Sequence, residues 1–195
     1  MTRNTALKEA VTLPDALAGR SIVLVGLMGA GKTSIGRRLA ERMGLQFADV
    51  DEAIERRTGT RVTTIFDCEG EAGFRVRERE MLAELLHGPA CVIATGGGAV
   101  LAPENRTLLH ARGFVVWLQV DLESQRQRLA RDRSRPLLQT PDRDAVLRRL
   151  ADERAPFYAG VADLAFPTDG LTAHEAADAL GALLLTQWHR SEAAA

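Results

Sequence analysis

The chain has 195 residues, which suits one α/β domain with room for a lid. Its 26 acidic and 25 basic side chains give a net charge of −1, so no global positive field favours nucleic acid as a partner. Cys68 and Cys91 are too few and too far apart for a disulfide framework or a zinc site, and we expect two buried or inert thiols of a reducing cytoplasm. No apolar run approaches the length of a membrane span, so we expect no membrane partner.

The chain opens with residues 1–20, which contain no continuous apolar stretch, and we expect a flexible extension there rather than a targeting segment. The elements predicted for the first half are a strand at 22–25, a helix at 34–43, a strand at 47–49, helices at 51–57 and 63–68, and a long charged helix at 71–86. Those predicted for the second half are a strand at 91–94, a helix at 103–111, a strand at 114–118, a helix at 122–130, a polar loop at 131–142, a helix at 143–157, a strand at 164–166 and a helix at 171–188. A frayed tail at 191–195 completes the chain. Alternating strands and helices indicate a parallel sheet covered on both faces, with ligands beyond the carboxyl ends of its strands.

A glycine-rich motif directly follows the first predicted strand and opens the first predicted helix. Residues 26–33 read Gly-Leu-Met-Gly-Ala-Gly-Lys-Thr, the G-x-x-x-x-G-K-[ST] pattern of a phosphate-binding P-loop. Such glycines turn consecutive N–H groups toward one anion, and the helix N-terminus adds its dipole. The chain has 23 Arg but only two Lys, Lys8 and Lys32, so a lysine here indicates a compact charge inside a narrow loop. A plain glycine turn is the structural alternative.

The next two strand ends also carry residues suited to ligand binding. Asp49 and Asp51 follow the second strand, and Gly96, Gly97 and Gly98 follow the third. In an extended segment, residues two apart point to the same side, so both carboxylates are expected to face one pocket. Asp-x-Asp could instead cap the next helix, and the glycines could form only a turn or allow close backbone approach to a ligand.

These motifs together resemble the shikimate kinase family from residue 21 to residue 187. The P-loop alone is shared by many kinases. The combination with Asp49-Val-Asp51, Gly70-Glu-Ala-Gly-Phe-Arg75, Gly96-Gly-Gly98 and Arg135-Pro-Leu-Leu138 in this order and spacing is highly specific. The resemblance implies a three-layer α/β sandwich with a five-stranded parallel sheet and P-loop kinase topology. It implies one kinase domain at 21–190 with a mobile lid at about 126–142. The implied reaction transfers the γ-phosphate of ATP to the 3-hydroxyl of shikimate, on the route to chorismate and aromatic amino acids.

The resemblance also implies the roles of individual residues. Arg75 and Arg154 are expected to bind the shikimate carboxylate, with Asp51 at the reacting hydroxyl, Gly97 lending a backbone N–H, and Gly96 and Gly98 beside it. Arg75 could also be a solvated helix residue, an interpretation that suits Arg77 and Arg79 better. The residues expected to bind ATP are Gly29, Ala30, Gly31, Lys32, Thr33, Ser34, Arg128 beside the adenine and Arg135 over the transferring phosphate. The residues expected at Mg²⁺ are Thr33 and Asp49.

The predicted mechanism is direct in-line transfer, with Lys32, Asp51 and Arg135 as catalytic residues. Two choices stay open: Asp51 acts as a general base or as a positioner, and Asp49 binds Mg²⁺ directly or through water. Shikimate and ATP are the expected partners of a cytoplasmic monomer, with no nucleic acid and no membrane. A gluconate kinase of the same fold and a non-catalytic nucleotide-binding protein are the alternatives.

The remaining aromatic and histidine residues carry weaker signals. Phe66 and Phe74 could line the substrate pocket or pack in the core, whereas Trp117 and Trp188 are expected to pack. The histidines lie without ligand spacing, so we assign them no metal: His87, His110, His174 and His189.

Overall fold

The computed structural model describes residues 20–130, 140 and 142–192, with side chains described as far as residue 186. Five strands form one sheet: β1 (Ser21–Val25), β2 (Gln46–Asp49), β3 (Cys91–Ala94), β4 (Gly113–Gln119) and β5 (Leu164–Pro167). All neighbouring pairs run parallel, in the order β2-β3-β1-β4-β5. The predicted five-stranded parallel sheet is therefore confirmed.

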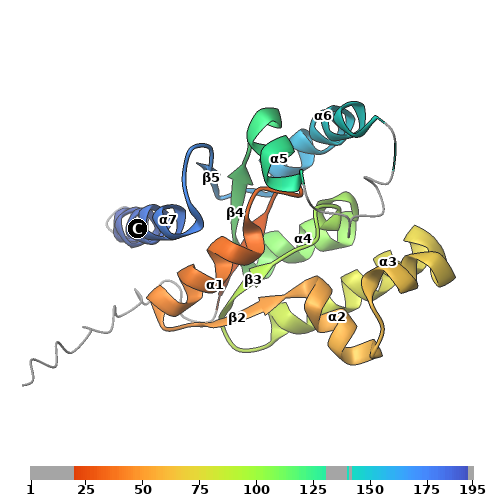
Figure 1. Cartoon of the computed structure of the whole chain (residues 1–195). Helices are drawn as coiled ribbons and strands as arrows, with labels where there is room; N and C mark the ends of the chain where they lie inside the picture. The colour runs from red at the N-terminus through yellow and green to blue at the C-terminus, as the bar shows by residue number, and fades with distance from the viewer. Residues whose placement is uncertain (1–19, 131–139, 141, 193–195) are drawn as a thin grey trace, which may run out of the picture.

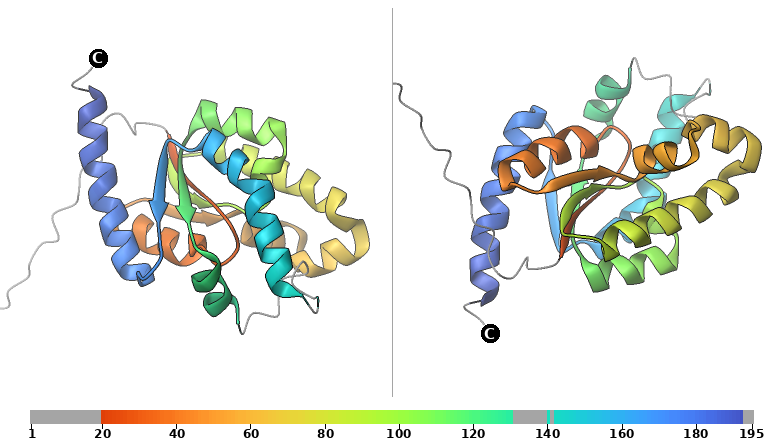
Figure 2. Two further views of the ribbon diagram at one scale, coloured as in Figure 1. Left: turned by 90° about the horizontal axis from the view of Figure 1, so that it is seen from above. Right: turned by 90° about the horizontal axis from the view of Figure 1, so that it is seen from below.

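Helices cover both faces of this sheet and produce three layers (Figure 1). On one face lie α1 (Lys32–Met43) and α7 (Ala173–Glu192), which pack against each other. The other face carries α3 (Val62–His87), α4 (Pro103–Arg112) and α6 (Arg143–Val161). Two shorter helices, α2 (Val50–Thr58) and α5 (Leu122–Leu129), pack on α3 and α6 respectively. Figure 2 shows the sheet between these two layers from above and from below.

The strand sequences explain the two layers, because successive side chains of a strand point to opposite faces. In β1, Val23 and Val25 enter the core beneath α3, α4 and α6, whereas Ile22 and Leu24 enter the core beneath α1 and α7. All five residues of β1 are buried, as expected for a central parallel strand covered on both faces. This central strand leads directly into the glycine-rich loop.

Several element boundaries differ from the sequence prediction. The helices predicted at 63–68 and 71–86 form one element, α3, which is kinked at Gly70 with φ 69° and ψ −177°. This conformation is essentially restricted to glycine, so the kink falls where the sequence permits it. Helix α6 continues past Phe157 to Val161, and α7 extends to Glu192, beyond both its predicted end and the start of the predicted frayed tail. The extension at 1–19 and most of the predicted lid lie outside the described residues.

The minor residues of the sequence analysis have mixed outcomes. Cys91 is buried and Cys68 is exposed on α3, and both thiols are free. The Trp117 ring packs against Tyr158, with ring centroids 5.9 Å apart, while the Trp188 side chain lies outside the description. Within the described residues, no cluster of three or more His, Cys, Asp or Glu side chains could hold a metal ion. No helix there has the length and apolar character that crossing a membrane requires.

Candidate active site

The glycine-rich loop joins β1 to α1 and is bent by three glycines with positive φ: Gly26 (139°), Gly29 (81°) and Gly31 (91°). A Cβ atom on Gly26 would lie 2.4 Å from the carbonyl oxygen of Leu118, so this position also needs glycine for close packing on β4. The sequence predicted this strand–loop–helix context, and the structure confirms it.

Two side chains of α5 hold the loop from outside. The buried amide of Gln125 donates from Nε2 to the Met28 carbonyl at 2.8 Å. Arg128 donates from Nη1 to the Gly29 carbonyl at 3.1 Å, and it also donates to the hydroxyl and carbonyl oxygens of Thr168. Gln125 was not predicted from the sequence, because an uncharged polar residue on the buried face of a short helix gives little indication of a functional role.

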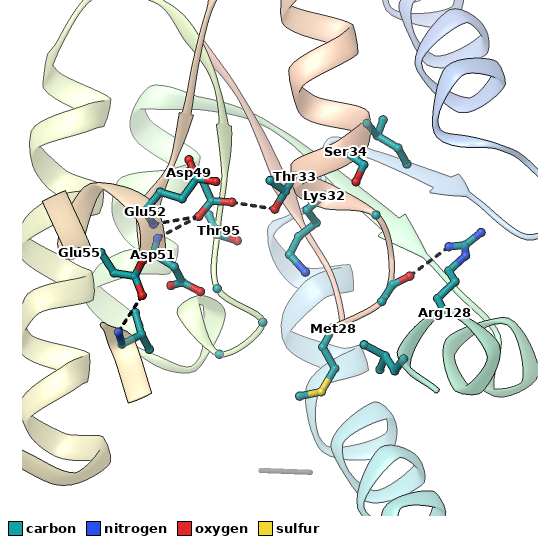
Figure 3. Close-up of a pocket in the computed structure, with 18 of the residues that line it drawn as sticks. Met28, Lys32, Thr33, Ser34, Asp49, Asp51, Glu52, Glu55, Thr95 and Arg128 are labelled. Atoms are coloured by element: carbon teal, nitrogen blue, oxygen red, sulfur yellow. Dashed lines mark hydrogen bonds between the residues drawn. The ribbon is translucent and has the colours of Figure 1, made fainter. Parts of the chain in front are cut away.

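The amine of Lys32 lies inside the bend of the loop. Nζ donates to the carbonyl oxygens of Gly26 and Leu27, both at 2.8 Å. The side chain is buried, and its position at the first residue of α1 is the one the P-loop pattern assigns to it. Figure 3 shows the Lys32 amine and the Asp51 carboxylate directed into the open space between the loop and α2.

The two aspartates after β2 have different local roles. Asp49 caps α2, since its Oδ1 accepts from the backbone N–H groups of Asp51 and Glu52 at 3.0 and 3.3 Å. Its other carboxylate oxygen accepts from the Thr33 hydroxyl at 2.7 Å (Figure 3). The two residues predicted to share a metal ion therefore lie in contact.

The reason given from the sequence for the placement of Asp51 is wrong, although the placement is right. Asp51 does not lie in an extended segment, because the cap formed by Asp49 turns the chain into α2 at Val50. Asp51 lies in the first turn of this helix, and both aspartates line the same cavity. The helix-capping alternative thus applies to Asp49, and it does not exclude a second role there.

That cavity has a volume of about 930 Å³ and lies at the carboxyl edge of the sheet. This size is within the range of small-molecule sites, roughly 300–1,000 Å³. It brings together nearly all candidate residues that the structure describes: Gly29, Gly31, Lys32, Thr33, Ser34, Asp49, Asp51, Arg75, Gly96, Gly97, Gly98, Arg128 and Arg154. Ala30 does not line the cavity, and its side chain is fully buried in the core beneath α1 and α7. Arg135 lies outside the described residues.

Arg75 is held by two carboxylates of its own helix. Its Nη1 donates to Glu78 Oε2 at 2.7 Å, and its Nη2 donates to Glu71 Oε1 at 2.8 Å. Glu78 is completely buried, and burial raises the pKa of its carboxyl against the opposing charges of Arg75 and Arg154. Arg75 is therefore not a solvated helix residue. Glu78 was missed, although its place four residues after buried Phe74 puts a charge on the apolar face of α3.

Arg77 on the same helix is partly solvent-exposed, as the interpretation of a solvated helix residue implies. Its guanidinium donates to both carboxylate oxygens of Glu69, at 2.9 and 2.7 Å. This pair spans the kink at Gly70, and neither residue lines the cavity.

The glycine triplet makes room for the charged groups around it. A Cβ atom on Gly98 would lie 2.2 Å from Nη2 of Arg75, and one on Gly96 would lie 2.5 Å from Oε1 of Glu78. A Cβ on Gly97 would lie 3.4 Å from Nη1 of Arg154, tighter than usual contact. The triplet is therefore more than a turn, because at Gly96 and Gly98 a side chain would displace the ion pair of α3.

Arg154 comes from α6 and lines the same cavity as Arg75, with its Nη1 next to Gly97. It is buried, as is Tyr158 one turn later on the same helix. Phe66 and Phe74, which the sequence assigned either to the pocket or to the core, both line the cavity and pack in the core. Phe74 is buried against Phe66, with ring centroids 4.7 Å apart, and both rings line the cavity.

A P-loop at the end of a central parallel strand, with a Thr–Asp pair beside it and two arginines in the same cavity, defines a P-loop phosphotransferase. A profile of the shikimate kinase family matches residues 28–184. The shikimate kinase of Stenotrophomonas maltophilia is 54% identical over 172 residues, covering 88% of this chain and 96% of the relative. That of Xanthomonas axonopodis pv. citri is 53% identical over 171 residues, covering 88% and 95%. The chain belongs to the shikimate kinase family.

Solved structures agree with this membership. The shikimate kinase of Acinetobacter baumannii, solved in complex with shikimate, has a TM-score of 0.84 and 44% identity, covering 89% of this chain and 98% of that one. A gluconokinase from Sinorhizobium meliloti has a TM-score of 0.51 at 17% identity, so the likeness extends only to the fold. The gluconate kinase alternative loses its support on this comparison.

Proposed function

We propose that the protein phosphorylates the 3-hydroxyl of shikimate with ATP, using the residues that line the cavity. The observation that carries this proposal is that two kinds of group line one cavity. Lys32 and the phosphate loop line it together with Arg75 and Arg154. The first set suits a polyphosphate, and two arginines suit a carboxylate, which each can bind bidentately.

The residues beside the loop fit a magnesium ion. Mg²⁺ prefers oxygen ligands, and the Thr33 hydroxyl and the Asp49 carboxylate supply two that already lie 2.7 Å apart. When bound with ATP, the ion would neutralise negative charge on the phosphate oxygens. Thr33 and Asp49 would hold it, and whether Asp49 does so directly or through water stays open.

The chain's own residues account for the remaining steps. Lys32 can exchange its two carbonyl acceptors for phosphate oxygens, because it lies inside the loop that would cradle them. Asp51, on the first turn of α2, would accept a hydrogen bond from the reacting hydroxyl and hold it in line. With a loose transition state little base strength is needed, so Asp51 serves as base or positioner.

Two further assignments rest on the family resemblance. Arg135, outside the described residues, is proposed to contact the transferring phosphate from a lid at about 126–142. Arg128, exposed at the rim of the cavity, is proposed to stack on the adenine, with Leu171 and Ala173 nearby in the cavity wall.

We also infer a cytoplasmic monomer whose kinase domain spans 21–190. A single chain supplies the P-loop, the aspartates and both arginines, so the proposed site is complete within one copy. The expected small-molecule partners are ATP and shikimate.

A coupled assay of ADP release tests the proposal. Release should require shikimate and should not occur with gluconate or other hydroxylated acids. Lys32→Met should stay folded but lose nearly all turnover, because the lost charge contributes on the order of several kcal/mol at the transition state. ADP release that does not depend on shikimate, or normal turnover of Lys32→Met, would contradict the proposal.

A further inference from the structure

The backbone segment that follows β3 is held in place by side chains from two other helices. Asn105 Nδ2 of α4 donates to the Ala99 carbonyl at 2.8 Å, and Arg106 Nη1 donates to the Val100 and Leu101 carbonyls, both at 2.8 Å. These contacts fix the short helix η2 (Ala99–Leu101), which directly follows the glycine triplet in the sequence. The triplet itself is held by one side chain from α6.

That side chain is Tyr158. Its hydroxyl donates to the Gly97 carbonyl oxygen at 2.5 Å, across 61 residues of sequence. The ring is almost completely buried and stacks on Trp117 with an interplanar angle of 27°. Trp117 pairs in register with Val25, the last residue of β1 before the P-loop. Tyr158 thus ties the glycine triplet to the part of the sheet that carries the phosphate loop.

The orientation of one peptide group follows from this hydrogen bond. In a trans peptide the C=O and the next N–H point in opposite directions. Because the Gly97 carbonyl points at Tyr158 in α6, the N–H of Gly98 in the same peptide points away from α6. Glycines have little intrinsic preference between peptide orientations, so an outside donor is needed to select one.

Gly97 lies where this orientation matters for both substrates. A Cβ there would be 3.4 Å from Arg154 Nη1, 3.5 Å from the Gly26 carbonyl oxygen and 3.6 Å from the Met28 N–H nitrogen. The triplet therefore lies between the phosphate loop and a cation proposed to bind the acceptor. If the peptide turned over, a carbonyl oxygen instead of an N–H would face the cavity and oppose an anionic ligand.

We propose that Tyr158 is a positioning residue, which fixes the Gly97–Gly98 peptide so that the Gly98 N–H faces the carboxylated acceptor. This inference rests on the proposed function. Tyr158 touches no reacting atom, and it acts through the peptide and through Arg154 one turn before it. Burial raises the pKa of Tyr158 to about 12, so the hydroxyl keeps its proton and stays a donor across the working pH range.

Tyr158→Phe removes the hydroxyl and keeps the ring against Trp117. Leaving a buried carbonyl unsatisfied costs about 1–3 kcal/mol, so KM for shikimate should rise at least about fivefold if that cost falls on the bound state. KM for ATP should change less than about twofold, because the phosphate loop keeps its own contacts with α5.

Ser21→Ala is the matched control. Ser21 is also buried, and its hydroxyl oxygen accepts from the Cys91 N–H at 3.2 Å, at the amino end of the sheet far from the cavity. This variant should lower the melting temperature without changing the ratio of the two KM values. If Tyr158→Phe behaved like Ser21→Ala, with lower stability and an unchanged ratio, Tyr158 would be a structural residue only and the inference would be overturned.

Amide hydrogen exchange in the unmodified protein gives a test that needs no variant. Saturating shikimate should slow exchange at Gly97 and Gly98, and unchanged exchange there would overturn the inference. If the unmodified protein showed no shikimate-dependent turnover, the proposed function would fail and this inference with it. Normal turnover with an unchanged KM ratio in Tyr158→Phe would overturn this inference alone.

Discussion

Replacing Arg75 with alanine should damage both stability and substrate binding, for separable reasons. In the folded protein this arginine is the hydrogen-bonded partner of Glu78, which is completely buried. It also lines the cavity and is proposed to bind the shikimate carboxylate. Arg75→Ala therefore leaves a buried carboxylate without its main partner and removes a cation from the binding site.

The structure sets the size of the stability effect. Removing one partner of a buried ion pair costs about 3–5 kcal/mol. Arg154 still opposes the effect of burial on Glu78, so we expect the lower end, a loss of about 3 kcal/mol. For a domain of this length that corresponds to a fall in melting temperature of about 6–12 °C.

The sign of the pH dependence follows from Glu78. Burial raises the pKa of Glu78 above its ordinary value of 4.5. Among the neighbouring charges that lower this pKa, Arg75 has the largest effect. Without Arg75 this pKa rises further. A raised pKa in the folded state gives stability that is present below the unfolded pKa and is lost as pH rises through the folded pKa. The deficit of Arg75→Ala should therefore grow as the pH rises from the ordinary carboxyl pKa of 4.5 through neutrality.

Urea denaturation over this pH range and steady-state kinetics make the measurement. Adding Glu78→Gln to Arg75→Ala should restore much of the stability and remove the extra pH dependence. It should not restore KM for shikimate, which we expect to rise about ten- to hundredfold from a lost charge-assisted contact.

Arg77→Ala is the control on the same helix, because its partner Glu69 is exposed and lies outside the cavity wall. It should change stability and both KM values little. The reasoning would be refuted if the double variant were no more stable than Arg75→Ala, or if Arg75→Ala left KM for shikimate unchanged.

Three further substitutions test other parts of the site. Asp49→Ala removes the cap of α2, so it should lower the free energy of unfolding by about 1 kcal/mol. It also removes a proposed metal ligand, so it should raise the Mg²⁺ concentration needed for half-maximal turnover. An unchanged Mg²⁺ requirement would exclude Asp49 from the metal site. Gly98→Ala places a Cβ 2.2 Å from Nη2 of Arg75, so KM for shikimate should rise while KM for ATP stays constant, and equal changes in both would argue against a local clash. Arg135→Ala should lower kcat strongly and leave shikimate affinity by titration nearly unchanged, with partial rescue by lysine. Arg133→Ala is its control and should be nearly silent; similar losses at both positions would show that the lid register is wrong.

Local patterns made much of this site predictable from the sequence. The P-loop signal depends only on the contiguous residues 26–33. The strand before this motif and the helix after it, β1 and α1, are correctly predicted from their apolar periodicity. Asp49 shows where such reasoning stops. Its position at the end of β2 was foreseen, but the choice between capping and ligand contact depends on where the Thr33 hydroxyl lies, which only the packed structure defines.

Two residues that were not predicted, Gln125 and Tyr158, share one property: their partners are remote in sequence. Gln125 contacts Met28 across 97 residues and Tyr158 contacts Gly97 across 61. Neither partner is a side chain, since both acceptors are backbone carbonyls that every residue type carries. A sequence pattern therefore contains no feature of the acceptor to pair with the donor. Glu78 differs, because a charge at a core position of α3 is itself a visible signal.

Lys32 in the P-loop and Arg75 in the cavity wall occupy two different kinds of space. The Lys32 ammonium fits between two carbonyls of one tight bend, both at 2.8 Å, where a planar guanidinium with five donors would not. Arg75 needs a wider space for its planar group, and Gly98 provides it by carrying no side chain. The cation is thus chosen by the room that neighbouring glycines leave. A Lys32→Arg exchange should therefore impair the phosphate loop even though it conserves charge, and Gly98 should tolerate no side chain while Arg75 is present.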